Sequence, residues 1–296
     1  MKDRTEVTQI GRDKINIIGV VSDEFTHPYT VTLLNELTRQ LNSRGCLTLL
    51  LNASSREGYQ AALRAAAPLS LDGLVFLASV TGDALSIAAD ILPGTPAVSV
   101  GNGATADAQA VSIDGYAAGR QVASLLLSQG YSRFGYLQGR ATDPLPQRAG
   151  YAAGLEAAHR PLKQILTADG LDREHAYRAT LAYLKQTWAS ERIDALFCDN
   201  DELAFGALQA VHDFGERVHV GVVGSDDSDE ARSPTWHLTT LSQRGDLLIA
   251  EALNRLLDNR RDENGAWRQG ELKVRHSHLS REVMSEPSQC GCAIRH

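Results

Sequence analysis

The sequence lacks any stretch that approaches the ~18 consecutive apolar residues needed to cross a membrane as a helix. Residues 1–14 mix charged residues with single apolar ones, so they contain no apolar core of the kind that a secretory signal requires. From these two absences we expect a cytoplasmic protein that has no contact with a membrane.

An excess of positive charge is also missing. The chain carries 29 basic and 36 acidic residues, which gives a net charge of −7. Surfaces that grip a nucleic-acid backbone are usually strongly basic. The composition therefore argues against direct nucleic-acid binding by these residues.

Cysteine is scarce, with four in 296 residues. Cys46 opens a predicted strand and Cys198 ends one, so we expect both to be small buried hydrophobic residues. Cys290 and Cys292 are too close together for the usual two-pair zinc spacing. They fall in a Ser-, Pro- and Gly-containing segment, 285–296, for which we expect a disordered tail and no metal.

What the sequence does contain is a regular alternation of short apolar runs and amphipathic stretches. The first run, residues 15–21, is almost uninterrupted and rich in isoleucine and valine, which is typical of a buried parallel strand. A helix is predicted after it, with Thr26 as its N-cap, Pro28 in its first turn and Gly45 as its stop. Further strands are predicted at 47–51, 73–78 and 97–100, and further helices at 57–67 and 83–92.

A second series of the same kind begins after residues 111–114. Strands are predicted near 133–138, 164–167, 195–198 and 219–224, with helices between them. The last part, 237–280, reads as a strand, a helix over 246–257 and a final strand or two, which could complete both sheets. The pattern predicts an α/β fold of two doubly wound, Rossmann-like parallel-sheet lobes joined by a multi-strand hinge. The expected lobes are 15–112 plus 244–271 and 113–243 plus 272–284, after a linker at 1–14.

Ligands of open α/β sheets bind outside the carboxyl ends of the strands, where helices also begin. Side chains that can form hydrogen bonds, together with one aromatic ring, follow the predicted strands. These candidate ligand-binding residues are Asp23, Phe25, Ser79, Asn102, Gln147, Arg148, Asn200, Asp226 and Gln243. Carboxylates, amides and one guanidinium around a ring suit a neutral ligand rich in hydroxyl groups, such as a sugar or related polyol.

Several residues at the same junctions have a purely structural alternative. Asp114 is expected to cap the helix that follows it, and Asp199 and Asp227 could equally be N-caps. Phe25 could be a hydrophobic staple on the first helix. Asn200 and Asp226 lie in polar clusters larger than one cap requires, which favours contact with a ligand.

Seven segments, in order from about residue 15 to 280, resemble the lactose-repressor/galactose-repressor family of bacterial regulators. They are residues 18–21 (IGVV) with 27–29 (HPY), 71–74 (LDGL), 114–119 (DGYAAG), 130–139 (GYSRFGYLQG), 200–206 (NDELAFG), 224–227 (GSDD) and 238–243 (LTTLSQ). The resemblance implies a type I periplasmic-binding-protein fold. By position it also implies that Phe25, Ser79, Asn200, Asp226 and Gln243 line an effector site.

The same resemblance implies a homodimer that binds operator DNA through a helix-turn-helix head. Residues 1–14 are similar only to the linker that follows such a head, so we expect a core without its head. Two further departures concern the cleft. Gln147 stands where the family usually has an arginine, with Arg148 as its neighbour, and Gln243 is followed by Arg244 in place of proline.

Two other classes of protein remain as alternatives. A solute-binding receptor of a transport system shares the expected fold but would need export. An α/β enzyme finds little support, because Gly101 and Gly103 lack a third glycine at dinucleotide spacing. The serines at strand ends lack nucleophile-elbow glycines, and the histidines show no metal-ligand spacing. We therefore expect no catalytic residues, metal or cofactor.

Overall fold

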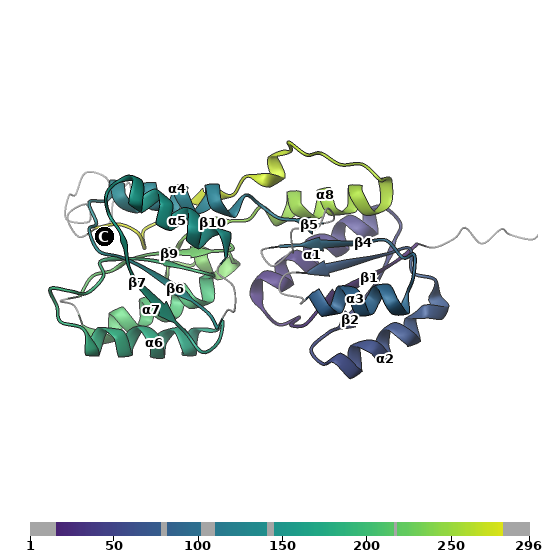
Figure 1. Cartoon of the computed structure of the whole chain (residues 1–296), viewed down its shortest axis with the longest axis horizontal. Helices are drawn as coiled ribbons and strands as arrows, with labels where there is room; N and C mark the ends of the chain where they lie inside the picture. Colours follow the sequence, from purple (N-terminus) through teal and green to yellow (C-terminus); the bar gives the residue numbers. More distant parts are fainter. Residues whose placement is uncertain (1–15, 78–81, 102–109, 141–144, 216–217, 281–296) are drawn as a thin grey trace, which may run out of the picture.

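In the computed structural model, described here for residues 16–77, 82–101, 110–140, 145–215 and 218–280, the chain forms two lobes side by side (Figure 1). Each lobe has one sheet with helices on both faces, so the predicted fold class is confirmed. No helix of these residues is long and apolar enough to span a membrane.

The first sheet has the order β2-β1-β3-β4-β5, and every pairing in it is parallel. Its strands are β1 (Ile17–Ser22), β2 (Leu47–Asn52), β3 (Gly73–Leu77), β4 (Ala97–Val100) and β5 (Ala110–Val111). One face is covered by α1 (Pro28–Ser43) and α8 (Gly245–Asp258), and the other by α2 (Arg56–Ala66), followed by η1 (Ala67–Leu69), and α3 (Gly82–Ile91). Burial of both faces explains the continuous apolar runs in β1 and β3.

The second sheet has the order β7-β6-β8-β9-β10-β11, in which β11 is antiparallel to β10. Its strands are β6 (Phe134–Gln138), β7 (Leu162–Thr167), β8 (Ala195–Cys198), β9 (Gly221–Ser225), β10 (Thr239–Ser242) and β11 (Glu271–Lys273). The helices α4 (Gly115–Ser128) and α5 (Pro146–Ala157) cover one face. The helices α6 (Arg173–Gln186) and α7 (Asp201–Phe214) cover the other, and two 3₁₀ turns complete the chain, η2 (Asp229–Arg232) and η3 (Ala266–Arg268).

The chain crosses between the lobes at three places in the described residues. These crossings are 112–114, between β5 and α4; 243–244, between β10 and α8; and 259–270, between α8 and β11. The first and third are tied together, because the Asp114 amide donates to the Arg268 carbonyl at 2.7 Å. Three separate segments of the chain therefore connect the lobes, and such an arrangement suits a hinge.

Three details differ from the expectations. Both strands of the last part join the second sheet, so the prediction that they complete both sheets is wrong, and β11 begins at Glu271. The first lobe instead receives α8. The N-cap of α1 is His27 and not Thr26, because Pro28 occupies the first helical position and the cap must directly precede it.

Other expectations hold. Asp114 caps α4 by accepting from the Ala117 amide at 2.9 Å. Cys46 and Cys198 are buried free thiols, as expected. Cys290 and Cys292 lie outside the described residues.

Close packing of α4 on α5 fixes the start of α5, which bears Gln147 and Arg148. A side chain at Gly119 would collide with the Gln147 carbonyl, and one at Gly150 would collide with the Tyr116 carbonyl. Glycine at both positions lets the two backbones touch. The beginning of α5 is therefore held rigidly at the end of the second sheet.

Candidate functional site

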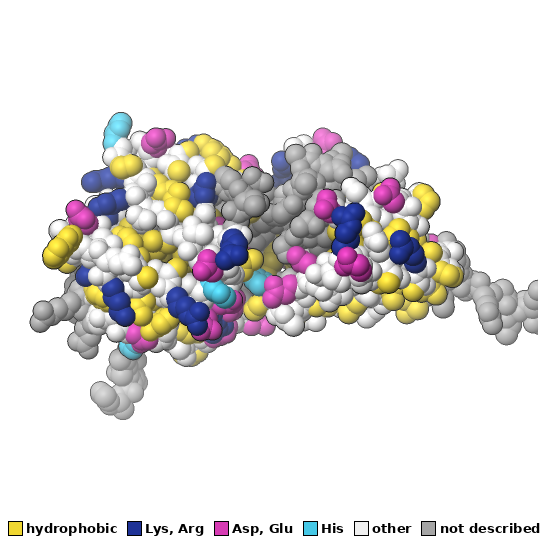
Figure 2. All heavy atoms as spheres, turned by 60° about the horizontal axis from the view of Figure 1, so that its bottom comes forward, with side chains coloured by type: hydrophobic (Ala, Val, Ile, Leu, Met, Phe, Trp, Pro, Cys, Tyr) yellow, Lys and Arg dark blue, Asp and Glu magenta, His cyan; other side chains and the backbone are white. Residues whose placement is uncertain are grey.

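The carboxyl ends of the two sheets face each other across the gap between the lobes. The contact that establishes this joins His27, at the start of α1, to Asn200, at the start of α7: His27 Nε2 lies 3.4 Å from Asn200 Nδ2. Both helices follow the carboxyl end of a strand, β1 and β8, and all parallel strands of a sheet end at the same edge. Figure 2 shows acidic and histidine side chains gathered where the lobes meet.

Both sheets change winding direction at the same place in their order, next to β1 in the first and next to β6 in the second. A ligand crevice is expected at such a switch point. The strand ends there are Ser22 for β1, Gln138 for β6 and Cys198 for β8. The candidate site is built around these ends.

The half-buried ring of His27 contacts a residue in each of the two lobes. Its Nδ1 accepts from the Tyr29 amide at 3.3 Å, which caps α1, while Nε2 points to Asn200. Burial lowers the pKa of His27, although the charges of Glu24, Glu202 and Asp23 act in the opposite direction. The ring is therefore a neutral hydrogen-bonding group at neutral pH.

Asn200 is buried and is the N-cap of α7. Its Oδ1 accepts from the Leu203 amide at 2.8 Å, and its Nδ2 donates to the Leu171 carbonyl at 3.2 Å. Asp199, for which a cap was one alternative, does not cap the helix. Its carboxylate accepts from the Tyr136 hydroxyl at 2.5 Å and from the Gly139 amide at 3.1 Å, and burial raises its pKa.

Asp226 and Gln243 form a pair at the ends of β9 and β10. Gln243 Nε2 donates to Asp226 Oδ1 at 2.7 Å, and Gln243 is only 2% exposed. Burial, followed by the charge of Asp201, raises the pKa of Asp226 well above its ordinary range. Tyr29 of the first lobe is close enough for the charge of Asp226 to raise its pKa further, after burial.

Three buried polar atoms in this region have no hydrogen-bond partner within the part of the chain that the structure describes. They are the Tyr29 hydroxyl, the Ser225 hydroxyl and Gln243 Oε1. Buried polar atoms are normally paired, because an unpaired one costs about 1–3 kcal/mol. Unpaired atoms from both lobes near Asp226 have the capacity to form hydrogen bonds with a polar molecule.

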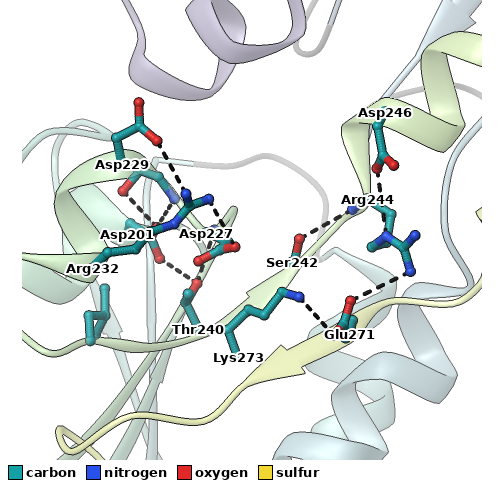
Figure 3. Close-up of polar contacts among 12 residues, drawn as sticks. Asp201, Asp227, Asp229, Arg232, Thr240, Ser242, Arg244, Asp246, Glu271 and Lys273 are labelled. Atoms are coloured by element: carbon teal, nitrogen blue, oxygen red, sulfur yellow. Dashed lines mark hydrogen bonds and ion pairs between the residues drawn. The ribbon is translucent and has the colours of Figure 1, made fainter. Parts of the chain in front are cut away.

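Asp201, which follows the Asn200 cap, is hydrogen-bonded to Thr240 of β10 (Figure 3). Its Oδ1 accepts from the Thr240 hydroxyl at 2.6 Å, and its Oδ2 accepts from the Ser228 amide at 2.7 Å and the Ser228 hydroxyl at 2.8 Å. Burial raises the pKa of Asp201 to about 6. The backbone of Asp226 has φ +117°, a strained value for a residue with a side chain, so the turn needs such support.

Asp227 is a structural residue and not an N-cap. Its carboxylate pairs with Arg275 at 2.5 Å and with Arg232 at 3.5 Å, and its amide donates to the Thr240 hydroxyl at 3.3 Å. Two arginines from different segments therefore fix the outer half of the turn.

Gln147 and Arg148 both lie at the start of α5, but they face different partners. Gln147 is almost completely buried, and its Nε2 donates to the Asp199 carbonyl at 3.3 Å. Arg148 Nη1 donates to Gln138 Oε1 at 2.5 Å, and its charge acts on Asp199. The arginine thus lies at the end of β6, beside the switch point of the second sheet.

The remaining predicted residues are placed less centrally. Phe25 is half-buried and packs against the large apolar cluster that includes α1, as a staple would. Asp23 is half-buried near His27. Ser79 and Asn102 lie outside the described residues.

Sequence reasoning missed Tyr29, His27, Gln138 and Asp201 as parts of this site. Gln138 ends β6 and could have been found by the rule that selected the other strand ends. Tyr29 belongs to one of the motifs, and its sequence context does not indicate that it lies near enough to the other lobe to feel the charge of Asp226.

Chemically, the arrangement offers hydrogen-bond donors and acceptors. No group of three or more His, Cys, Asp or Glu side chains in the described part of the chain is placed to hold a metal ion. The site therefore has the chemistry to bind and orient a polar molecule between the two lobes.

Residues 16–225 match the family model of periplasmic binding proteins and the sugar-binding domain of the LacI family. A curated relative is the HTH-type transcriptional repressor PurR of Escherichia fergusonii. It is 31% identical over 266 residues, which cover 83% of this chain and 74% of PurR.

Solved structures with the same fold include two LacI-family regulators. The one from Lactobacillus casei, with bound sucrose, is 22% identical, has a TM-score of 0.72 and matches 88% of this chain and 99% of its own. The one from Arthrobacter sp. FB24, in complex with lactose, is 18% identical, has a TM-score of 0.74 and matches 89% of this chain and 99% of its own.

Proposed function

The chain belongs to the LacI family, and from this premise we propose that it is the effector-sensing and dimerisation core of a transcriptional regulator. The effector is a sugar or related polyol that binds between the lobes. The relative PurR is a repressor, which favours a regulator over a solute receptor of a transport system. A regulator acts on DNA, so we place the protein in the cytoplasm.

One observation carries the proposal: unpaired buried polar atoms from both lobes lie around the Asp226–Gln243 pair. The Tyr29 hydroxyl comes from the first lobe, and the Ser225 hydroxyl and Gln243 Oε1 come from the second. A molecule with several hydroxyl groups can donate to Gln243 Oε1 and can donate to or accept from the two protein hydroxyls. Structural neighbours with bound sucrose and bound lactose support the same class of ligand.

The proposed mechanism is a change of lobe closure. A ligand that contacts both lobes has more contacts when they are closed, so it shifts the population toward that state. The three hinge crossings allow rotation while keeping the lobes in register. In a homodimer, rotation of one lobe would change the spacing of two DNA-binding heads, a coupling typically worth ~1–3 kcal/mol.

Calorimetry and thermal unfolding with a panel of sugars and polyols test the binding step. The variant Gln243→Ala should weaken the binding of any ligand found by about tenfold, because it removes a buried acceptor and leaves Asp226 without its donor. The variant Gln209→Ala is a matched control, since Gln209 is exposed on α7 and bonds Asp213. Equal loss in both variants, or binding by no member of the panel, would contradict the proposal.

The dimer and the closure need separate measurements. Sedimentation velocity should give a mass of two chains, and small-angle scattering should give a smaller radius of gyration when a ligand is present. A monomer at all concentrations would argue against a dimeric regulator, and an unchanged radius would argue against closure.

A further inference from the structure

The His27 ring must carry a hydrogen on Nε2 as long as it caps α1. Its Nδ1 accepts from the Tyr29 amide at 3.3 Å, so Nδ1 presents a lone pair and has no hydrogen. A neutral imidazole ring has a hydrogen on only one of its nitrogens, which is then Nε2. His27 therefore presents a hydrogen-bond donor to the second lobe, toward Nδ2 of Asn200.

The side-chain amide of Asn200 is oriented by two bonds within its own lobe. Its Oδ1 accepts from the Leu203 amide at 2.8 Å, and its Nδ2 donates to the Leu171 carbonyl at 3.2 Å. A backbone amide only donates and a backbone carbonyl only accepts, so exchanging the oxygen and nitrogen of Asn200 would break both bonds. The atom that faces His27 is therefore a nitrogen, and the bond to Leu171 uses only one of its two hydrogens.

The contact between the lobes thus joins two donors. His27 Nε2 and Asn200 Nδ2 are 3.4 Å apart, and among the described residues neither the Nε2 hydrogen nor the second Nδ2 hydrogen has an acceptor. Moving the ring hydrogen to Nδ1 does not remove the conflict, because Nδ1 would then oppose the Tyr29 amide. One donor faces another in either form of the neutral ring. An acceptor atom beside both nitrogens would satisfy them together.

Two further observations suit an acceptor that belongs to a ligand. Asn200 is only 6% exposed, and buried N–H groups are normally paired. The Tyr29 hydroxyl, in the first turn of α1, is also buried without a partner in the described part of the chain. The negative charges of Glu24 and Glu202 act on His27, so a neutral oxygen suits this place better than an anionic one.

We propose that His27 Nε2 and Asn200 Nδ2 together bind one oxygen atom of the ligand, a hydroxyl or ether oxygen that accepts a hydrogen bond from each lobe. This inference rests on the proposed function, because it adds His27 to the same cleft and states how closure there depends on the ligand. An oxygen about 2.9 Å from each nitrogen, the usual N–H···O length, can bridge donors that are 3.4 Å apart. With the oxygen present the two lobes are held together here, and without it the opposed donors disfavour the contact.

The first test uses the full chain without any sugar. Nitrogen-15 NMR of the histidine-labelled protein should show the His27 hydrogen on Nε2, and the signal absent from the variant His27→Ser identifies this residue. A His27 hydrogen on Nδ1 would overturn the inference, because Nε2 would then accept from Asn200 directly and the contact would need no ligand.

The second test gives His27 an acceptor from the protein itself. The variant Asn200→Asp keeps one oxygen for the cap of α7 and offers the other to His27 Nε2, so small-angle scattering should give a smaller radius of gyration than for the sugar-free natural protein. The variant Asn200→Ser is the matched control: serine can also cap the helix and also loses the bond to Leu171, but it offers His27 no second oxygen. Its radius should stay that of the natural protein. A radius in Asn200→Asp no smaller than in Asn200→Ser would contradict the inference.

The third test is calorimetry with sucrose, lactose, glucose and sorbitol. The variant His27→Ser keeps a capping side chain on α1 but lacks the Nε2 donor, so it should weaken the binding of any of these probes that binds the natural protein by about three- to tenfold, the loss of one hydrogen bond. The variant His212→Ser, at an exposed position of α7, should bind as the natural protein does. Unchanged affinity in His27→Ser would overturn this inference and leave the proposed cleft intact. Binding by none of the four probes would count against the proposed function and this inference together.

Discussion

His27 and Asn200 cap helices of different lobes, and their side-chain nitrogens meet across the cleft at 3.4 Å. Each side chain is fixed by its cap, His27 by the Tyr29 amide and Asn200 by the Leu203 amide. The contact between the lobes is therefore made by groups that local structure has already oriented. It brings the start of α1 against the start of α7.

The variant His27→Ala should lower the free energy of unfolding by about 0.5–2 kcal/mol, because it removes the N-cap of α1. The variant Thr26→Ala should change it by less than about 0.5 kcal/mol, since Thr26 is exposed and does not cap. Urea unfolding of both variants measures the difference. A larger loss of unfolding free energy in Thr26→Ala than in His27→Ala would indicate that Thr26 is the cap.

The variant Asp201→Asn should destabilise the protein by about 1–3 kcal/mol at pH 4–5, because it replaces an acceptor of three hydrogen bonds. Since burial raises the pKa of Asp201 to about 6, the folded state holds this proton more tightly than the unfolded state does. The contribution of the carboxyl to stability is then present at low pH and lost as the pH rises toward 6 and above.

The difference in unfolding free energy between the natural protein and Asp201→Asn should therefore shrink between about pH 4 and pH 7. The control is Asp229→Asn, whose carboxylate is 99% exposed on the neighbouring η2 turn, and its difference should stay flat. A difference that grew with pH would contradict the sign of the pKa shift.

His278 should give a pH dependence of the opposite sign. Burial lowers its pKa to about 4, and its Nδ1 lies 2.8 Å from the Thr239 hydroxyl. The unfolded state takes up this proton near pH 6.5, so the contribution to stability is present above that pH and is lost as the pH falls toward 4. The loss should be about 1–3 kcal/mol, since one pKa unit is worth about 1.4 kcal/mol.

The variant His278→Gln should remove this loss, as followed by urea unfolding between pH 4 and pH 7.5. The variant His212→Gln, on an exposed position of α7, should retain it. If His278→Gln kept the same dependence on pH as the natural protein, the group responsible would lie elsewhere.

Arg244 occupies the second hinge crossing with φ +53°, a left-handed conformation. Its guanidinium pairs with Asp246 at 3.6 Å and with Glu271 of β11 at 3.5 Å, and Glu271 also pairs with Lys273 (Figure 3). The variant Arg244→Gly should be about 1 kcal/mol more stable than Arg244→Ala, because glycine adopts this backbone without strain. Equal stability of Arg244→Gly and Arg244→Ala would contradict a left-handed backbone at this position.

The two Arg244 variants should also depend less on salt than the natural protein does. Exposed ion pairs are worth at most about 1 kcal/mol and are screened at high ionic strength. Thermal unfolding at 0.05 M and 1 M sodium chloride measures the effect. An undiminished salt dependence in both variants would assign it to other charges.

The sequence predicted most elements to within two residues, and the reason is visible in β4 and β8. Both strands are short apolar runs with polar residues directly after them, and their observed bounds, Ala97–Val100 and Ala195–Cys198, match the predicted ones. The last strands could not be assigned to a sheet, because β10 and β11 have no local feature that distinguishes one sheet edge from the other.

The sequence predicted which residues lie at the strand ends of the site, but it did not predict which of their side chains form hydrogen bonds with each other. Asn200 was expected to contact a ligand and could be recognised as polar at a junction, yet most of its hydrogen-bonding capacity is used by α7 and by Leu171. The bond between Gln243 and Asp226 joins the residues that directly follow β10 and β9, two strands that are neighbours only in the folded sheet. No spacing rule along the chain could have identified it.

The order in which the three crossings occur along the chain has a consequence for synthesis on the ribosome. All five strands of the first sheet are present once residue 111 has emerged, but α8, which packs on β3, β4 and β5, is translated only from residue 245 onward. Until then the apolar surface that Leu248, Ile249, Ala252 and Leu253 later cover has no partner from its own lobe. The first lobe therefore cannot complete its fold until nearly all of the second lobe has been synthesised. A chain that ends at a premature stop codon before residue 245 would expose an apolar surface prone to aggregation.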